Sequence, residues 1–447
     1  MKSDALNSFV VEVVSGRHSR RELLQRAAAL GIGATAAAGF IDSASAQDTG
    51  TPSAGGTGSL EVFSWWTSEG EHPALVALFD AFLAANPDVE IIDAGVAGGG
   101  GGPAQAVLQT RLQGNQPPDS WQSHPGHELI DQYVNAGYCE TMTDLYESEG
   151  WSAAIPQELI DLCSKDGEQY LVPLNVHRGN GLWYNKEVVE GAGVTVGDTM
   201  SLEEWSAAAE TLKAAGITAL AFGDKDGFVP AQTFENHLLG SLGPEKYSAL
   251  FANEAPWDSD EVKEVMTSFS TLFDHINSDH SALAWSDATA LIIEGKAAFN
   301  TMGDWAYGEF VAKKVEDKMG WVSYPGSTGS FVLVVDGFTK PKDAPNPENV
   351  IEWLKSCGTI EAQAAFNQLK GSIPARTDVP VEEGFSEYHK WSAASFAGDA
   401  LVPSAAHGLA TSPAFKQAFY DAAIAFVTDR DVEVFSASLT DAVAAEA

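Results

Sequence analysis

Hydrophobic periodicity in residues 60–135 limits the fold of this chain more than any other feature of its sequence. Residues 60–66 alternate in polarity as a strand does, whereas the leucines and phenylalanines of 73–85 recur at helical spacing. The same criteria predict strands at 88–92 and 120–124 and helices at 103–113 and 126–135. Such an alternation of strand and helix is typical of an α/β domain with a largely parallel sheet.

Five consecutive glycines, residues 98–102, precede the helix predicted at 103–113. No Gly-Lys-Ser/Thr follows them, and their spacing is not that of a dinucleotide fingerprint, so the pattern argues weakly for a phosphate site. We interpret the glycines as a place where the backbone approaches other groups closely at the start of a helix.

Beyond residue 170 the pattern changes. Residues 171–185 are extended, contain Pro173 and two glycines, and predict a segment that crosses between two lobes. Further helices are predicted at 201–216, 231–242, 260–278 and 286–294, a buried strand at 331–338, and mainly helices from 347 onward. Ser201 with Glu204 makes a capping-box pattern, and Ser412 before Pro413 marks another helix start.

The segment 295–308 brings the chain back after the helix at 286–294. Its apolar run 297–299 leads into a turn that carries Asn300, Asp304 and Trp305. Taken alone, the segment fits a structural turn around a core tryptophan as well as it fits a return into a ligand cleft. Trp66, Gln122, Asp304 and Asp336 each lie at or after the end of a predicted strand, which is where α/β sheets bind ligands.

The first 46 residues have the features of an export signal rather than of folded structure. Arg20-Arg21 match the twin-arginine motif, and the uncharged run 27–41 that follows is too short for a membrane span. Ala44-Ser45-Ala46 gives a cleavage site, so we expect an extracytoplasmic protein starting at Gln47, with residues 47–58 as a flexible linker. No cysteine lies near this cleavage site, so a lipid anchor of the usual lipoprotein kind is not expected.

The chain is strongly acidic, with 25 Lys and Arg against 62 Asp and Glu and a net charge of −37. This charge would repel nucleic acid and anionic membranes, so neither is expected as a partner. The acidic residues are scattered, as in salt-adapted proteins; the alternative is a secreted protein that is merely acidic.

The three cysteines, Cys139, Cys163 and Cys357, lie far apart without metal-ligand spacing. We expect them to be small core residues, although one disulfide plus a free thiol stays open. We expect no metal and no cofactor.

An ordered series of short motifs covers nearly all of the chain after residue 60. It comprises residues 63–66, 109–112, 117–119, 122–124, 172–178, 295–305, 369–373 and 407–408. The series resembles the extracellular sugar-binding proteins of ABC importers, solute-binding family 1, and most closely their glucose-binding members. The resemblance implies two α/β lobes with a ligand cleft between them, as in periplasmic binding proteins. It places residues 59–174 and 303–338 in the N-terminal lobe and residues 175–302 and 339–447 in the C-terminal lobe.

The resemblance also implies a set of ligand-binding residues. A pyranose has C–H patches on its faces, which indole rings cover, and a rim of hydroxyl groups, which polar side chains address. The stacking candidates are Trp65 or Trp66 and Trp285, and the hydrogen-bonding candidates are Glu71, Gln122, His124, Asp336, Lys370 and His407. Asp304 either joins this set or fixes the crossing segment. Because residues 67–73 are one residue longer than the family pattern, Glu69 could stand in place of Glu71.

The expected function is that of a monomeric receptor that binds glucose or a similar mono- or oligosaccharide and delivers it to an ABC transporter permease. A secreted glycosidase is one alternative, because paired carboxylates in a sugar cleft can also hydrolyse glycosides. Against an enzyme, the sequence contains no nucleophile elbow and no zinc-protease motif. A sugar sensor that docks on a receptor is the other alternative. The sequence leaves open which sugar is bound.

Overall fold

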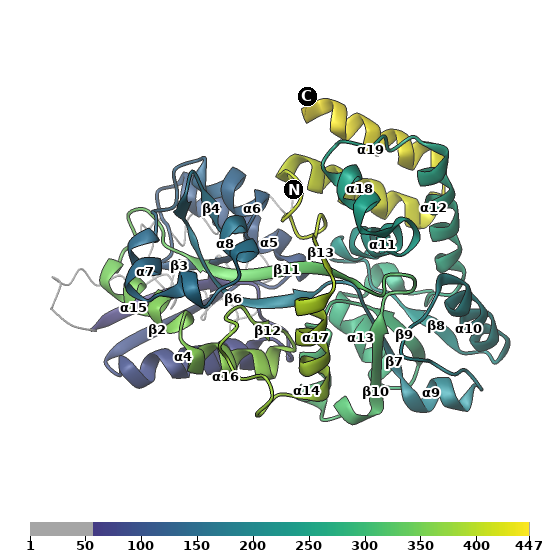
Figure 1. Ribbon diagram of the computed structural model, residues 1–447, viewed down its shortest axis with the longest axis horizontal. Coiled ribbons are helices and arrows are strands. Elements are labelled where there is room, and N and C mark those ends of the chain that lie inside the picture. The colour runs from purple at the N-terminus through teal and green to yellow at the C-terminus, as the bar shows by residue number, and fades with distance from the viewer. Residues whose placement is uncertain (1–56, 447) are drawn as a thin grey trace, which may run out of the picture. The chain divides into compact units, whose positions relative to one another are not determined.

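Two β-sheets organise residues 57–446, the part of the chain described by the computed structural model (Figure 1). Along the seven-stranded sheet lie β12 (Ile373–Pro374), β6 (Leu171–Arg178), β11 (Ser330–Thr339), β3 (Ser120–Ser123), β1 (Gly58–Ser64) and β2 (Val89–Gly95), and β13 (Ala400–Pro403) also pairs with β11. Along the four-stranded sheet lie β10 (Met319–Ser323), β7 (Gly181–Asn185), β9 (Ala297–Thr301) and β8 (Thr218–Ala221). A small separate pair consists of β4 (Ser164–Lys165) and β5 (Glu168–Gln169). The signal peptide expected at 1–46 and most of the linker expected at 47–58 lie outside the described residues.

The larger sheet is mixed, not largely parallel as expected. Its β1 pairs in parallel with β2 and with β3, which are the strands of the strand–helix alternation. However, β11 pairs antiparallel with β3 and with β6. The difference has a topological cause: β6 and β11 are long strands that arrive from or lead to the other sheet, so no helical crossover sets their direction.

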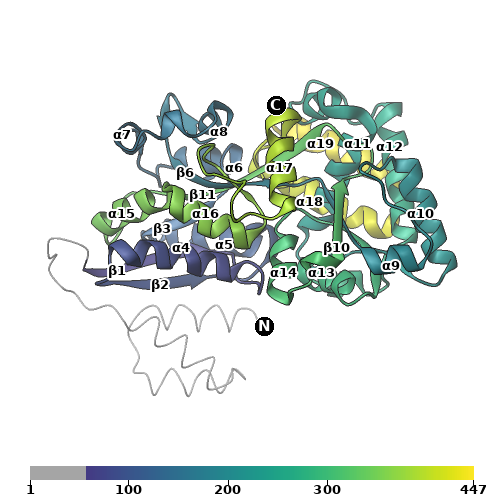
Figure 2. The ribbon, with the colours of Figure 1, turned by 60° about the horizontal axis from the view of Figure 1, so that its bottom comes forward.

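The elements around the seven-stranded sheet form the first lobe. Its helices are α4 (His72–Ala85), α5 (Gly102–Gln113), α6 (His127–Leu129), α7 (Thr143–Ser148), α8 (Gln157–Leu162), α15 (Pro347–Cys357) and α16 (Ile360–Lys370). The buried face of α4 consists of Ala74, Leu75, Leu78, Phe79 and Phe82, at the predicted helical spacing. Figure 2 shows α4, α15 and α16 together on one side of this sheet.

The elements around the four-stranded sheet form the second lobe. Its helices are α9 (Lys186–Gly191), α10 (Leu202–Ala214), α11 (Phe228–Phe251), α12 (Asp260–Ser270), α13 (Trp285–Ile293), α14 (Ala306–Lys313), α18 (Pro413–Asp429) and α19 (Val432–Glu446). The capping box predicted at the start of α10 is present, and Ser412 caps α18 by accepting a hydrogen bond from Phe415 N. The helix predicted to end at 242 does bend there, since Gly243 has φ 78° before Pro244, but α11 continues beyond the kink.

Each lobe has its own hydrophobic core, and β11 contributes to both. Phe331, Leu333 and Val335 point into the first core, whereas Val332 and Val334 point into the second. This division follows from the period-2 alternation of a strand. Figure 1 shows β6 and β11 side by side in the middle of the described unit, with α17 (Glu387–Gly398) next to them. The strand β11, which links the lobes, is therefore also part of both interiors.

The expected lobe boundaries differ from this packing at two places. Residues 303–322, expected in the N-terminal lobe, place Trp305 and Phe310 in the second core. Residues 347–375, expected in the C-terminal lobe, include α15 and α16, which pack on α4 in the first core. The chain passes between the cores near 323–331 and again near 375–388, and buried apolar residues lie on both sides of each passage.

The three cysteines are free thiols. Cys163 and Cys357 are buried and Cys139 is half-buried, as expected for small core residues. Burial raises the pKa of the Cys163 thiol, which keeps it protonated and unreactive. Within residues 57–446, no helix is both long and apolar enough to cross a bilayer.

Candidate functional site

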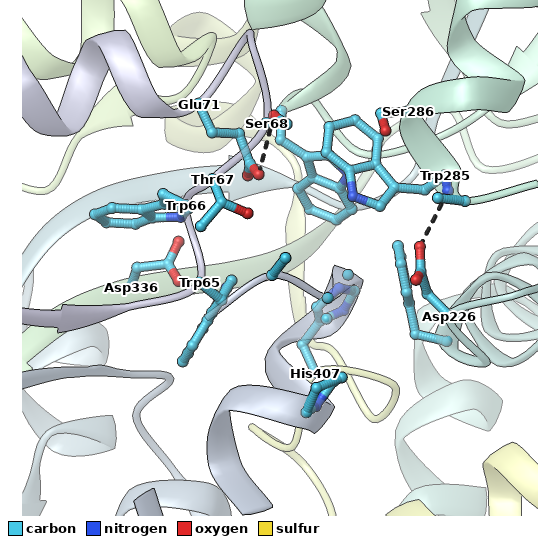
Figure 3. Close-up of a pocket in the computed structure, with 18 of the residues that line it drawn as sticks. Trp65, Trp66, Thr67, Ser68, Glu71, Asp226, Trp285, Ser286, Asp336 and His407 are labelled. Atoms are coloured by element: carbon cyan, nitrogen blue, oxygen red, sulfur yellow. Dashed lines mark hydrogen bonds between the residues drawn. The ribbon is translucent and has the colours of Figure 1, made fainter. Parts of the chain in front are cut away.

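A cavity of about 400 Å³ lies between side chains of the two lobes (Figure 3). Figure 3 shows Trp65, Trp66 and Asp336 on one side and Trp285 with Asp226 on the other. The first group comes from the end of β1 and from β11, and the second from the start of α13 and the loop before α11. The size is that of a small-molecule site.

Eight of the ten predicted site residues line this cavity. They are Trp65, Trp66, Glu71, His124, Trp285, Asp336, Lys370 and His407. They come from distant parts of the sequence. Most of them meet because the parallel strands β1 and β3 end at the same edge of the first sheet, where the antiparallel β11 passes beside the end of β3 and brings Asp336 to it. Lys370 at the end of α16 and His407 in the loop after β13 lie next to this edge, and Trp285 comes from the second lobe. The two others, Gln122 and Asp304, are buried behind the cavity wall.

Gln122 holds two cavity residues in place. Its Nε2 donates to Asp336 Oδ1 at 2.8 Å, and its Oε1 accepts from the backbone N of Trp65 at 3.1 Å. Both ends of the amide are thus satisfied inside the protein, and the side chain fixes the positions of a carboxylate and an indole.

Asp304 is fully buried and connects the return segment to β6. Its carboxylate accepts from the backbone N of Arg178 at 3.0 Å and from the Tyr388 hydroxyl at 3.3 Å, and it is hydrogen-bonded to His177 Nδ1. These contacts correspond to the second of the two expected roles, a carboxylate that fixes the crossing segment. The first role, direct binding of a ligand, has no support from this geometry because Asp304 does not line the cavity.

Asp336 lies between two imidazoles. His124 Nε2 is 3.5 Å from Oδ1, and His177 Nε2 is 3.4 Å from Oδ2. Burial alone would raise the pKa of Asp336, but the hydrogen bond from His177 and the positive charges of His124, His177 and Lys370 hold it below its usual value. The cavity therefore contains an ionised carboxylate at neutral pH.

Each imidazole is in turn supported by another buried carboxylate. His124 Nδ1 is 3.0 Å from Glu128 Oε2, and His177 Nδ1 is bonded to Asp304. Burial alone would lower the pKa of His177, yet its contacts with Asp304 and with Asp336 raise it above the usual histidine value. His407 differs, because burial lowers its pKa well below that value and keeps the ring neutral. A neutral ring offers one donor and one acceptor.

The cavity also contains a buried ion pair. Lys370 Nζ donates to Glu71 Oε1 at 2.6 Å, and the same ammonium lies 5.6 Å from the centre of the Trp66 ring. Glu69, the alternative to Glu71, is exposed and pairs with Lys313 on the surface. Glu71 is therefore the residue that lines the cavity. Charge-assisted groups of this kind form stronger hydrogen bonds than neutral ones.

Aromatic rings make up much of the wall. Trp65 packs on His124 with ring centres 5.1 Å apart, and Trp305 packs on His407 at 5.2 Å. Trp66 is backed by Phe366 at 4.8 Å. Flat apolar faces thus alternate with ionised and hydrogen-bonding groups around one small space.

Sequence reasoning did not assign several residues that line the cavity, notably His177, Trp305, Asp226 and Phe228. His177 could have been found, since it is an ionisable residue within a strand, β6, whose eight residues are all buried. Trp305 lies in the segment 295–308, whose predicted turn was noted in the sequence, but it was not assigned to the site. Asp226 and Phe228 carried no signal, because nothing in their sequence neighbourhood distinguishes a cavity loop from an ordinary one.

The arrangement combines aromatic faces with ionised and hydrogen-bonding groups, as small-molecule binding sites do. Within the described part of the chain, no group of three or more His, Cys, Asp and Glu side chains has the geometry to hold a metal ion. A two-lobed α/β architecture with a cavity of polar and aromatic side chains between the lobes defines a binding protein of the periplasmic type.

Comparison with known proteins gives the same class. The sequence model for the family described as bacterial extracellular solute-binding protein matches residues 66–364. An uncharacterised ABC transporter extracellular-binding protein of Pyrococcus horikoshii is 33% identical over 389 residues, which cover 86% of this chain and 87% of that protein. A probable sugar-binding periplasmic protein of Brucella suis is 33% identical over 374 residues, 81% of this chain and 86% of that protein. Among solved structures, the bacterial solute receptor AcbH, described as having an exclusive preference for β-D-galactopyranose, has a TM-score of 0.75 at 20% identity, covering 88% of this chain and 99% of its own.

The chain belongs to the family of bacterial extracellular solute-binding proteins. The expected resemblance to the binding proteins of ABC importers is confirmed at the level of the family, as is the extracytoplasmic class. Members of this family bind solutes and are not enzymes, so the glycosidase alternative is not retained.

Proposed function

We propose that this protein binds one molecule of glucose, or of a closely related hexose, in the cavity between its lobes and delivers it as a monomer to the permease of an ABC importer. The observation that carries the proposal is the cavity itself. It presents the ionised Asp336, the Glu71–Lys370 pair and the imidazoles of His124 and His407 between indole faces. The ordered motif series is the reason for choosing glucose among the hexoses.

The chemistry of this wall suits a pyranose. The faces of Trp65, Trp66 and Trp285 can cover C–H patches, and the charged groups can address hydroxyls. Two or three charge-assisted hydrogen bonds at roughly 1.5–3 kcal/mol each contribute on the order of 3–9 kcal/mol. Micromolar affinity corresponds to about 8 kcal/mol net of the costs of association, so stacking and lobe closure must supply the remainder.

Calorimetry on the mature protein tests the proposal. Asp336→Ala and Lys370→Ala should each weaken glucose binding by roughly 30- to 1,000-fold, because a buried partner is left without its hydrogen bond. Asp336→Asn keeps the shape of the side chain and should also weaken binding, which separates the loss of charge from a packing defect. Glu348→Ala, at an exposed position on α15, is the control and should bind as the parent does.

The same titrations identify the sugar and the stacking residue. Glucose, galactose, mannose and xylose should be compared in molar salt, and glucose should bind most tightly. Trp65→Ala and Trp66→Ala should be measured side by side, since the true platform will show the larger loss. If the Asp336 and Lys370 variants bind glucose like the parent, the site is elsewhere; if no sugar binds the parent, the function is wrong.

Export through the twin-arginine route is part of the proposal. Arg20 and Arg21 lie outside the described residues, and the paired guanidinium groups are the feature that an export receptor would read. Changing both to lysine keeps the charge and removes that feature. We expect the precursor to accumulate in cells, detected by immunoblotting of cell and medium fractions. Normal secretion of the double variant would contradict the proposal.

A further inference from the structure

The glycine run predicted to be a close backbone approach is packed against aromatic rings. At Gly99, a Cβ would lie 2.6 Å from Cδ1 of Trp285 and 2.7 Å from Cε1 of Phe228. At Gly100, it would lie 3.1 Å from Cβ and Cγ of Phe228. Real Cβ atoms essentially never come within 3.0 Å of another heavy atom and seldom within 3.4 Å, so the rings lie directly on the backbone of the loop.

This contact joins the two lobes. Gly99 precedes α5 of the first lobe, whereas Phe228 and Trp285 begin α11 and α13 and belong to the second core. Two residues further along, the ring of Trp65, which belongs to the first core, lies 3.0 Å from the position of a Cβ at Gly101. The loop therefore contacts aromatic side chains of both lobes.

The same atoms form part of the cavity wall. Gly99, Phe228 and Trp285 all line the cavity, and Trp285 is only 6% exposed. Its position is fixed from behind, because its backbone N donates to Asp226 Oδ2 at 3.2 Å (Figure 3). The indole can give way to a new Cβ only if it moves off the loop or if the lobes separate.

We propose that the contact of Gly99 with Trp285 and Phe228 is a seal that closes the cavity at this end and retains the bound sugar. The inference rests on the proposed function. The seal forms only when the lobes are together, since its two halves belong to different cores. A side chain at position 99 therefore weakens the closed, sugar-bound state and leaves each lobe intact.

A glycine outside the cavity provides the control. Gly99 lies outside the left-handed region, so alanine there meets no backbone strain and acts through the contact alone. Gly191, the last residue of α9, also lies outside that region, and no atom lies within 4 Å of a Cβ built on it. Gly99→Ala and Gly191→Ala thus add the same methyl group, one in the seal and one in open space.

Stopped-flow tryptophan fluorescence with glucose, or with the tightest sugar of the panel, measures the effect. We expect Gly99→Ala to weaken binding at least about tenfold, through faster dissociation with little change in the association rate. Gly191→Ala should stay within about twofold of the parent. In a Trp285→Ala background the effect of Gly99→Ala should be smaller, because one of the two rings that its methyl group meets is gone while Phe228 remains.

Each outcome decides the inference. Gly99→Ala binding like the parent overturns it, and so does an undiminished effect in the Trp285→Ala background, which would show a local defect of the loop. Phe228→Leu removes the second ring without adding any atom to the loop, and it should also speed dissociation; an unchanged rate overturns the seal even if Gly99→Ala fails to fold. A parent protein that binds no sugar overturns the proposed function and the seal with it, whereas sugar binding with unaffected variants overturns the seal alone.

Discussion

At the scale of single residues, the cavity depends on a chain of alternating acids and bases. Asp336 is flanked by His124 and by His177, and behind His124 stands Glu128, which also accepts from Lys416 Nζ at 3.0 Å. A buried charge is tolerated when an opposite charge and hydrogen bonds surround it, and it is costly otherwise. The ionisation of Asp336 therefore depends on the imidazoles beside it and, behind one of them, on Glu128, which does not line the cavity.

Glu128 gives a test of this chain that does not depend on any ligand. Burial alone would raise its pKa, but the charges of Lys416 and His124 lower the pKa of Glu128 from 4.5 to about 2. Because the folded pKa lies below the unfolded one, its stabilisation is present above pH 4.5 and is lost as the pH falls towards 2. We expect Glu128→Gln to have a melting temperature that falls less steeply than that of the parent over this range.

The measurement is a series of thermal unfolding scans at constant high salt. Glu348→Gln, an exposed carboxylate on α15, is the control and should follow the parent curve. Parallel curves for the parent and Glu128→Gln would show that the carboxylate is not stabilised by its neighbours.

At this scale, sequence alone identified residues of the right chemistry but did not separate those that line the cavity from those buried behind its wall. Residue types that bind sugars, such as Trp65 and Lys370, lie in motifs and were placed in the cavity wall. Gln122 and Asp304 have the same chemistry but satisfy their hydrogen bonds inside the protein. Sequence records the type of side chain and not which of two layers it occupies, since that depends on the twist and stagger of neighbouring strands.

At the scale of elements, Arg178 fastens the strands that link the lobes. The guanidinium is fully buried between the rings of Phe331 at 4.4 Å and Trp391 at 4.5 Å. It donates to the carbonyl of Ser330 at 3.2 Å and pairs with Asp399 at the end of α17. One side chain at the end of β6 thus connects β11 to α17, although these three elements are distant in sequence.

We expect Arg178→Lys to destabilise the protein by about 2–3 kcal/mol, because an ammonium cannot stack between two rings or bond in several directions in one plane. Chemical denaturation would measure this loss. Arg430→Lys is the matched control: Arg430 is exposed and makes a 2.6 Å bond to Asp274, so the change should cost less than about 1 kcal/mol. Equal effects of the two substitutions would contradict the role of Arg178.

Helices and strands whose apolar residues recur at a regular spacing were predictable from the sequence, but the elements that they pack against or pair with were not. The spacing of apolar residues gave α4 and the strand–helix series up to α5, and a capping pattern located α10. The pairing of β6 with β11 joins residues about 160 positions apart and no local signal specifies it, so the sheet was expected to be more parallel than it is. For the same reason, α15 and α16 were expected in the other lobe.

At the scale of the whole molecule, the net negative charge is the feature with the largest expected effect on stability. Four acidic and five basic residues precede Gln47, which leaves 58 acidic and 20 basic residues in the expected mature chain. The acidic residues are distributed over both lobes and are not confined to a tail. A net charge of this size opposes the compact state through self-repulsion, and salt screens it over about 10 Å at 0.1 M and less at molar concentration.

We therefore expect the melting temperature to fall markedly when the salt concentration is lowered from molar to millimolar. The cause is electrostatic, so a variant with less negative charge should depend less on salt. Asp80→Asn, Asp88→Asn, Glu90→Gln and Glu147→Gln, combined, remove four exposed carboxylates without touching the cavity. Thermal scans of both proteins across the salt series should show a shallower dependence for the combined variant. A parent protein whose melting temperature is unchanged by salt, or a combined variant with the same dependence, would count against salt adaptation.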